Sequence, residues 1–534
     1  MKTLLTNAKI YDGTGKDAYT GSVLIENDII VAAGIDAGAD CTADRIIDLG
    51  GLSIAPGFID GHSHNDWFAI KSEPLKYFET FIKQGITTFV SGNCGLSEIG
   101  FTHNSGYIDR VGGGLFGFGD TTGKYADFEE FCSAVDGKMP CNMAELVGHC
   151  TARASAGGVD GGKLTEAQEK EMLENLEHSL AQGAAGVSLG LMYNPGLFAD
   201  IDELKKVAAL CIKYDRPLTV HPRAESKVSM AYPQLLGRSH LLRALDELYE
   251  IAKRTNLKLQ YSHCIFVGRN TFGDIDEVTR IFNKMKAEGI QIGYDIYNEL
   301  LGVSVITVIL PAWYQALSPE EREKPFTKLR LSLLVNASAA LLGFGFKDIQ
   351  FAYGGPELEK YEGMTVAEIA KERGDKCLDT YLWLCRETDF KGRVNMGPYT
   401  TREILRKQMN DPMSNYMSDA WIEDYGVQNP AVYDNYPKFL KDSLTGFGCS
   451  MPETIRKMSG KIADRFGLAG RGYILEGAYA DLTVFDEEEL KNTEPDQSKS
   501  FGIKKVFING KLVLDGGLLD TETLKTSGRV IRCL

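Results

Sequence analysis

The sequence predicts an α/β protein whose core is a (β/α)8 TIM-like barrel, completed by a small β-sandwich domain and by a lobe inserted between the seventh and eighth strands. Eight short apolar runs alternate with helix-type patterns through the middle of the chain, which is typical of a parallel barrel. Strand-type patterns without helices occupy both chain ends. A doubly wound open sheet is the alternative, but no Gly-x-Gly-x-x-Gly motif follows the first strand.

The composition excludes several classes of function. The chain has 534 residues, of which 43% are hydrophobic, with a formal net charge of -15 and a pI of about 5.2. This acidity argues against a nucleic-acid partner and against a polybasic membrane anchor. No apolar run approaches the ~18 residues of a membrane span, and the start of the chain lacks a signal-peptide core. The 11 cysteines have no framework spacing, which indicates reduced thiols and a cytoplasmic protein.

The two chain ends, residues 1–52 and 471–534, are predicted to fold together as the β-sandwich. Neither end is long enough to close a core alone, so we expect their strands to share one. The dipeptide Asn509-Gly510 is a strong hairpin signal. The candidate strands and hairpins are residues 4–10, 23–31, 481–486 and 504–514.

Residues 53–470 are predicted to form the barrel. The eight strands are expected at residues 53–60, 87–93, 142–149, 186–191, 217–223, 258–264, 291–297 and 414–419. Helical patterns between them cover residues 163–182, 201–214 and 241–254, and a last shell helix covers residues 452–466.

The gap before the eighth strand is too long for one helix and predicts an inserted lobe at about residues 298–360. Helical signals in the gap are found at residues 319–323, 328–341 and 377–387, with a capping box at Thr365-x-x-Glu368. A lobe on this face of a barrel usually covers the active site.

Residues that can bind a metal follow most of the predicted strands. His62 and His64 end the first strand, and their i, i+2 spacing places both imidazoles on one strand face. Later strands end in Cys94, His149, His221, His263 and Asp419. Five of the 8 histidines thus lie where barrel enzymes carry their chemistry, which predicts a metal site. Taken singly, each residue has a structural alternative, such as a core thiol for Cys94 or a helix N-cap for Asp419.

Several motifs also point to a known family. They are Pro56-Gly-Phe-Ile-Asp60 with His62-x-His64, Gly92-Asn-Cys94-Gly95, Val147-Gly-His149, His221-x-Arg223-x-Glu225, Ser262-His263, Leu310-Pro-x-Trp313, Ser418-Asp419 and Ala480-Asp481-Leu. Over nearly its whole length the sequence resembles the amidohydrolase superfamily, and within it the D-aminoacylase (N-acyl-D-amino-acid deacylase) family. The segment around Cys94 is the more specific marker, because most dinuclear relatives use a carboxylated lysine of the fourth strand instead.

The resemblance implies a role for each candidate residue. Cys94, His221 and His263 would hold one tightly bound Zn²⁺, while His62, His64 and Asp419 would frame a second, weaker position with Cys94 bridging. Asp419 would also act as the general base in hydrolysis of an amide bond. Candidate substrate-binding residues are Tyr193, Arg223 and His149, although Arg223 could equally form a structural ion pair with Glu225.

The sequence departs from the family where the substrate binds. The family usually carries His-Pro-Arg where this chain reads Asn429-Pro430-Ala431, and that arginine grips the substrate α-carboxylate. Members acting on acidic substrates have a lysine at the position of Ile265. The expected substrate is therefore an N-acyl-D-amino acid with a neutral or apolar side chain rather than Asp or Glu.

Two other functions stay open at this point. One is hydrolysis of a cyclic amide (hydantoin, dihydropyrimidine or lactam type), or of another amide that lacks the usual α-carboxylate. The other is a non-catalytic scaffold, which is least favoured because all six candidate metal-ligand positions are filled. The expected partner is a small-molecule amide, with no nucleic acid and no membrane, and a homo-oligomer is left open.

Overall fold

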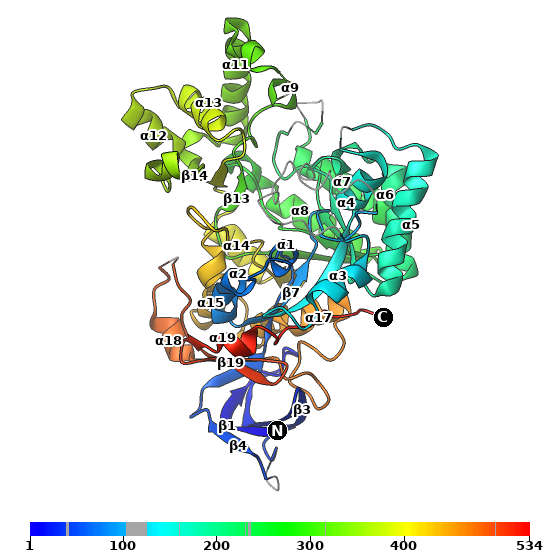
Figure 1. The fold of residues 1–534 in the computed structure, drawn as a ribbon, viewed down its shortest axis with the longest axis vertical. Helices are drawn as coiled ribbons and strands as arrows, with labels where there is room; N and C mark the ends of the chain where they lie inside the picture. The colour runs from blue at the N-terminus through cyan, green and yellow to red at the C-terminus, as the bar shows by residue number, and fades with distance from the viewer. Residues whose placement is uncertain are drawn as a thin grey trace.

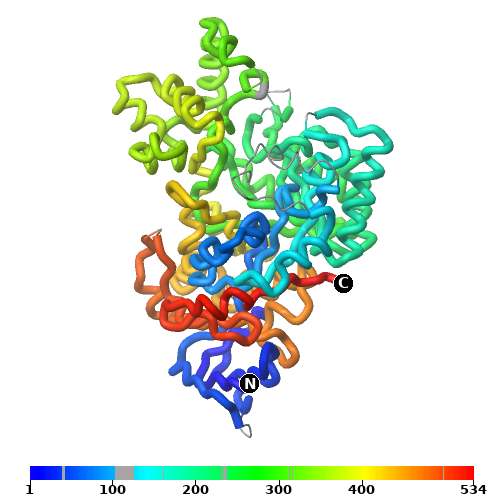
Figure 2. The backbone as a smooth tube through the Cα atoms, in the orientation of Figure 1, coloured from blue at the N-terminus to red at the C-terminus, as the bar shows by residue number. Residues whose placement is uncertain are grey.

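The structure is a computed structural model that describes residues 1–38, 42–102, 125–159, 161–229, 231–232, 237–315, 317–496 and 498–534. Figure 1 shows three parts along the longest axis of the molecule. The inserted lobe lies at the top, the barrel in the middle, and a β-sheet domain with the N-terminus at the bottom. The tube in Figure 2 shows that the C-terminal segment passes along the lower side of the barrel, so both chain ends lie in the lower half.

The barrel has eight parallel strands in the order β16-β12-β11-β10-β9-β8-β7-β6, which confirms the predicted fold class. Buried side chains fill both faces of these strands, as expected for a parallel sheet covered by helices. The strands are β6 (Phe58–Asp60), β7 (Ile86–Ser91), β8 (Asn142–Gly148), β9 (Gly186–Gly190), β10 (Leu218–His221), β11 (Lys258–Tyr261), β12 (Gln291–Ile296) and β16 (Ser414–Tyr416).

The gap between the last and first strands is closed beyond the strand ends. The amide of Asp419 donates to the carbonyl of His62 at 3.1 Å, and the amide of Ser418 donates to the Asp60 carboxylate at 2.9 Å. These bonds bring the predicted base next to the first pair of predicted ligands.

Helices surround the barrel and join its strands. The predicted last helix is broken at Ser459 into α16 (Met451–Met458) and α17 (Gly460–Phe466). The other helices of this part are α1 (Asp66–Ala69), α2 (Leu75–Lys83), α3 (Phe128–Val135), α4 (His149–Gly157), α5 (Glu166–Gln182), α6 (Ile201–Lys213), α7 (His240–Ala252), α8 (Ile275–Ala287), α14 (Arg402–Met409) and α15 (Ala431–Leu444).

Strands from both chain ends form one nine-stranded sheet, as predicted. The sheet branches at β1, which pairs with β2 on one side and with β4 and β5 on the other, and its two arms share one apolar core. The elements are β1 (Lys2–Ile10), β2 (Tyr19–Glu26), β3 (Ile29–Gly34), β4 (Arg45–Asp48), β5 (Ser53–Pro56), β17 (Leu482–Phe485), β18 (Ile503–Ile508), β19 (Lys511–Asp515), β20 (Leu518–Leu519), α18 (Glu487–Asn492) and α19 (Thr521–Leu524).

The strand predicted at residues 53–60 belongs to both parts. Its first half, β5, pairs with β1 and β17 of the small sheet, while its second half is the first barrel strand. The chain passes from the small sheet into the barrel at Gly57. An added Cβ there would lie 2.3 Å from the Thr87 hydroxyl oxygen, so a side chain does not fit. The barrel therefore begins at Phe58 rather than at residue 53.

The lobe contains a three-stranded antiparallel sheet in the order β13-β15-β14, packed around its own apolar core. Its central strand ends at Met396, so the lobe extends well beyond the expected boundary near residue 360, and α14 is the barrel helix before β16. The elements are β13 (Gly302–Val305), α9 (Ala312–Gln315), α10 (Pro319–Glu323), α11 (Pro325–Leu342), β14 (Ile349–Tyr353), α12 (Val366–Arg373), α13 (Cys377–Glu387) and β15 (Arg393–Met396). Among the described residues, none of the helices has the length and apolar character of a membrane span.

Candidate metal centre

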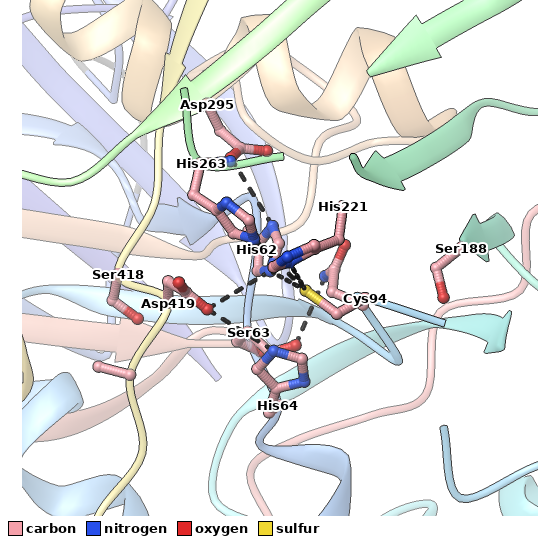
Figure 3. A network of polar contacts seen from close by, with 12 residues as sticks. His62, Ser63, His64, Cys94, Ser188, His221, His263, Asp295, Ser418 and Asp419 are labelled. Carbon is pink, nitrogen blue, oxygen red and sulfur yellow. Dashed lines mark hydrogen bonds and ion pairs between the residues drawn. The ribbon is translucent and has the colours of Figure 1, made fainter. Parts of the chain in front are cut away.

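The predicted metal ligands meet at the C-terminal ends of the barrel strands. Figure 3 shows three histidines around the Cys94 sulfur, with Asp419 between His62 and His64 on the side away from Ser188. Asp419 Oδ1 lies 3.5 Å from His62 Nε2 and 3.6 Å from His64 Nε2. The prediction that His62 and His64 share one strand face was wrong, because β6 ends at Asp60 and both histidines lie in the following loop. A bend at Gly61 and His62, rather than a strand pleat, precedes the second ring.

Cys94 lies in a tight loop whose backbone requires left-handed conformations. Its φ is +54°, and the flanking Gly92 and Gly95 have φ of +76° and +74°. Strand β9 supports this loop, since Ser188 donates to the carbonyl of Gly92 and accepts from the amide of Gly95 at 3.0 Å. Gly190, on the same strand, approaches so closely that an added Cβ would lie 1.9 Å from the Cys94 carbonyl oxygen. The fourth strand therefore uses small residues to seat the cysteine loop.

This close approach makes Gly190 a sensitive position. We expect Gly190→Ala to push the Cys94 loop away from the histidines and to weaken binding of the Zn²⁺ expected from the sequence by about 10-fold or more, an effect at least as large as loss of a residue that only orients a ligand. Zinc affinity measured by competition with a chromophoric chelator tests this expectation. Gly273→Ala is the matched control, because its added methyl group meets no atom within 4 Å. Equal zinc affinity in both variants would contradict this account of the loop.

The Cys94 sulfur lies close to three imidazole nitrogens. It is 3.4 Å from His62 Nε2, 3.5 Å from His221 Nδ1 and 3.5 Å from His263 Nε2. Compact groups that could hold a metal ion are His62, Cys94 and His263; His62, His64 and Asp419; and His221, Glu225 and His263. All six predicted ligands thus belong to one cluster. His62 is as near to the thiol as His221 and His263 are, so the division of ligands between two positions stays a prediction.

The surroundings of Cys94 favour a thiolate. Burial would raise the pKa of this thiol, but His62, His221 and His263 lower it well below its usual range. Burial instead raises the pKa of the seven other buried cysteines that the structure describes, which are Cys132, Cys141, Cys150, Cys211, Cys264, Cys385 and Cys533. This contrast supports a ligand rather than a core thiol at Cys94.

Asp419 is placed to act as a base. Burial would raise the pKa of its carboxyl group, but His62 and His64 lower it below its usual range, so the group is ionised at neutral pH. Its side chain is 24% exposed, unlike the nearly fully buried histidines, and it lines the cavity above the cluster. No helix begins at Asp419, since α15 starts at Ala431, so the N-cap alternative does not apply.

Two carboxylates that were not assigned to the site from the sequence hold the histidines. Asp295 accepts the backbone amide of His263 and lies 3.7 Å from His62 Nδ1. Glu225 accepts a hydrogen bond from His263 Nδ1 at 2.6 Å. His263 has a φ of +33°, and strained backbone of this kind is common at functional sites. Glu225 belongs to a quoted motif, but motif spacing could not show which side chain it contacts.

Only one of the three predicted substrate-binding residues lines the cavity. Tyr193 lines the cavity, with its ring 4.7 Å from that of His221. Arg223 is outside the cavity lining, because its guanidinium bonds to Glu247 and to two backbone carbonyls. His149 also lies outside it, bonded to Glu203 at 2.8 Å. The geometry favours structural roles for Arg223 and His149. The predicted ion pair between Arg223 and Glu225 was wrong, because Arg223 pairs with Glu247.

A cavity of about 140 Å³ opens above the cluster, between the barrel and the lobe. Tyr193, Tyr297 and Tyr399 carry hydroxyl groups in its lining, and their pKa values are raised by burial, so they stay protonated hydrogen-bond donors. No lysine or arginine is found among the lining residues that the structure describes. Its apolar lining residues are Met192, Ala224, Ile265, Val267, Val303, Val308, Met396 and Trp421.

Comparison with known proteins gives three consistent matches. Residues 45–292 match the sequence model of the Amidohydrolase family. A D-aminoacylase of Alcaligenes xylosoxydans xylosoxydans is 26% identical over 523 residues, which cover 95% of this chain and 93% of that protein. A crystal structure of D-aminoacylase superposes with a TM-score of 0.79 at 23% identity, over 99% of both chains.

A second solved structure adds a bound metal to the comparison. It is an N-acyl-D-glutamate deacylase from Bordetella bronchiseptica, complexed with zinc and a phosphonate mimic of the tetrahedral intermediate. It superposes with a TM-score of 0.77 at 23% identity, over 99% of both chains. Both superpositions show a shared fold.

Proposed function

We propose that the chain is a member of the amidohydrolase family and that it hydrolyses N-acyl-D-amino acids to a carboxylate and a D-amino acid with bound zinc. One observation carries the proposal: a thiolate, four histidines and a carboxylate meet beneath a cavity at the C-terminal end of the barrel. That edge is where barrel enzymes hold their reacting groups. The D-aminoacylase name of the relative that matches over nearly the whole chain supports the reaction class.

The donor set fits zinc. Zinc bonds of about 2.3 Å to sulfur and about 2.0 Å to nitrogen, at tetrahedral angles, separate the two ligand atoms by about 3.5 Å. The observed distances from Cys94 sulfur to the ring nitrogens are 3.4–3.5 Å. We propose Cys94, His221 and His263 as ligands of the tight ion, and His62, His64 and Asp419 with Cys94 as the frame of a weaker position.

Zinc held there supplies a Lewis acid that polarises the amide carbonyl and lowers the pKa of water. The residues of the chain do the rest. The ionised Asp419 accepts the proton of the attacking water and then delivers it to the leaving nitrogen as the C–N bond breaks. Tyr193, beside His221 in the cavity, is placed to donate a hydrogen bond to the substrate.

The cavity lining supports a neutral or apolar side chain on the substrate. Ile265 and Val267 line it from the barrel, and Val303 and Met396 line it from the lobe. A second carboxylate buried among them would lack a cationic partner, which costs several kcal/mol. Tyrosine hydroxyls are the neutral donors that would hold the α-carboxylate in place of an arginine.

The lack of a lysine or arginine among the described lining residues also favours a second candidate, an amide without the α-carboxylate. Ala431, where the family carries an arginine, is fully buried in the first turn of α15 and presents no charge. We rank this candidate second, because the relative that matches over nearly the whole chain is named for the D-aminoacylase reaction.

A substrate panel separates the two candidates. We expect hydrolysis of N-acetyl-D-methionine and N-acetyl-D-leucine, with the L-forms inert and kcat/KM for N-acetyl-D-glutamate lower by about 100-fold or more. Release of the free amino acid is measured by amine derivatisation. Zinc-loaded protein that cleaves hydantoins, dihydropyrimidines, lactams or N-acyl amino-acid amides, but none of the free acids, would overturn the first candidate in favour of the second.

A further inference from the structure

Glu225 occupies an unusual position beside the cluster. The residue is only 6% exposed, and one carboxylate oxygen accepts the Nδ1 hydrogen of His263 at 2.6 Å. The other oxygen lies 3.8 Å from His221 Nε2. One buried carboxylate therefore faces the rear nitrogens of two rings whose front nitrogens both face the Cys94 sulfur.

The surroundings of Glu225 do not explain it as an ordinary salt bridge. Its ion pairs within the described part of the chain are both with histidines. The nearby arginine, Arg223, pairs with Glu247 instead. A buried carboxylate without a cationic partner is costly, so it needs a positive charge in its surroundings. Two histidines bound to a divalent ion would supply that charge.

We infer that Glu225 is a positioning residue of the metal centre, orienting His263 and His221 and fixing their ring tautomers for metal binding. A hydrogen bond at Nδ1 of His263 leaves its Nε2 lone pair directed at the metal position, and the carboxylate makes the ring a stronger donor. His221 is too far from Glu225 for a hydrogen bond, so the negative charge of the carboxylate is what orients its ring. The inference rests on the proposed metal site and adds a residue to it.

The backbone holds this carboxylate in place. The carbonyl of Glu225 accepts the amide of Val267 at 2.8 Å, and Ser226 forms a β-bridge with Val267. The loops after the fifth and sixth barrel strands are thereby joined next to the two histidines. Because its backbone is held in this way, Glu225 can restrain the orientation of the two imidazole rings.

Zinc affinity tests the inference. We expect Glu225→Gln to raise the zinc dissociation constant by about 10-fold and Glu225→Ala to raise it by about 100-fold, the usual range for loss of an outer-shell carboxylate. Competition with a chromophoric chelator measures both. The melting temperature of the metal-free proteins separates this effect from general destabilisation, and we expect Glu225→Gln to match the parent there.

A matched control uses another carboxylate–histidine pair of the same barrel. Glu203 accepts a hydrogen bond from His149 at 2.8 Å and is also buried, but His149 lies outside the cluster. Glu203→Gln should leave zinc affinity at the parent value. An equal loss of affinity in Glu203→Gln and Glu225→Gln, or no loss in either, would overturn the inference.

Cobalt substitution separates positioning from direct ligation, because Glu225, His221 and His263 could also form a ligand group of their own. In the positioning arrangement, the cobalt protein and its Glu225→Gln variant both show the thiolate charge-transfer band of Cys94. A cobalt protein without that band, whose d–d spectrum is lost in Glu225→Gln, would make Glu225 a ligand and overturn the inference. Failure of the parent to bind either metal would overturn the proposed function as well.

Discussion

Replacing Cys94 with alanine is expected to abolish zinc binding and amide hydrolysis together. The sulfur lies within 3.5 Å of three imidazole nitrogens, and it is the soft donor shared by both proposed positions. Loss of a direct ligand should weaken zinc binding by more than the ~100-fold that outer-shell changes cause. Zinc content after gel filtration and turnover of the best substrate should fall in parallel.

Cys150 provides the control for this experiment. It is buried beside the same loop, where its thiol donates to the carbonyl of Gly190 at 3.3 Å, and burial raises its pKa to about 12. Cys150→Ala removes a buried thiol of the same size without removing a thiolate, so zinc content and turnover should remain near the parent values. Full zinc content in Cys94→Ala would show that the metal is held elsewhere.

Asp419→Asn is expected to retain the tight zinc ion while losing turnover by about 10²–10⁴-fold, the range of a general base. The amide keeps the shape of the side chain but cannot accept a proton at neutral pH. The ligands proposed for the tight ion, Cys94, His221 and His263, are unchanged. Zinc content and kcat measured on the same preparation test both halves of this expectation.

Asp424→Asn is the companion variant, since Asp424 lies five residues further along and pairs with Lys76 and Tyr77 outside the cavity. It should keep both zinc and turnover. Parent-level kcat in Asp419→Asn would remove Asp419 from the role of base. Loss of zinc in Asp419→Asn would instead show that Asp419 acts mainly as a metal ligand.

The fold was predictable because its signals are local. Apolar runs and helix patterns in the middle of the chain predicted all eight barrel strands, although the first begins at Phe58 rather than at residue 53. Asn509-Gly510 marked the terminal hairpin, where both residues adopt positive φ. The lobe boundary was less accurate. A sheet strand such as β15, which pairs with strands far from it in sequence, has no local signal that assigns it to the lobe.

The site was predictable in its members but only partly in its contacts. Residues at strand ends converge in a barrel, so Cys94, His263 and Asp419 could be brought together from the sequence. Pairing between buried side chains depends on distant elements instead. Arg223 forms its ion pair with Glu247 of helix α7 rather than with its near neighbour Glu225, and no rule based on residue spacing could predict this pairing.

The most direct test of the account is a zinc titration of the metal-free enzyme while hydrolysis of N-acetyl-D-methionine is followed. We expect negligible turnover without metal and a rise in turnover that levels off near one zinc per chain. Additional zinc should then change the rate far less, because the second position is weaker. Full turnover by the metal-free protein, or a rise that also occurs in Cys94→Ala, would contradict the proposal that these side chains form a hydrolytic zinc centre.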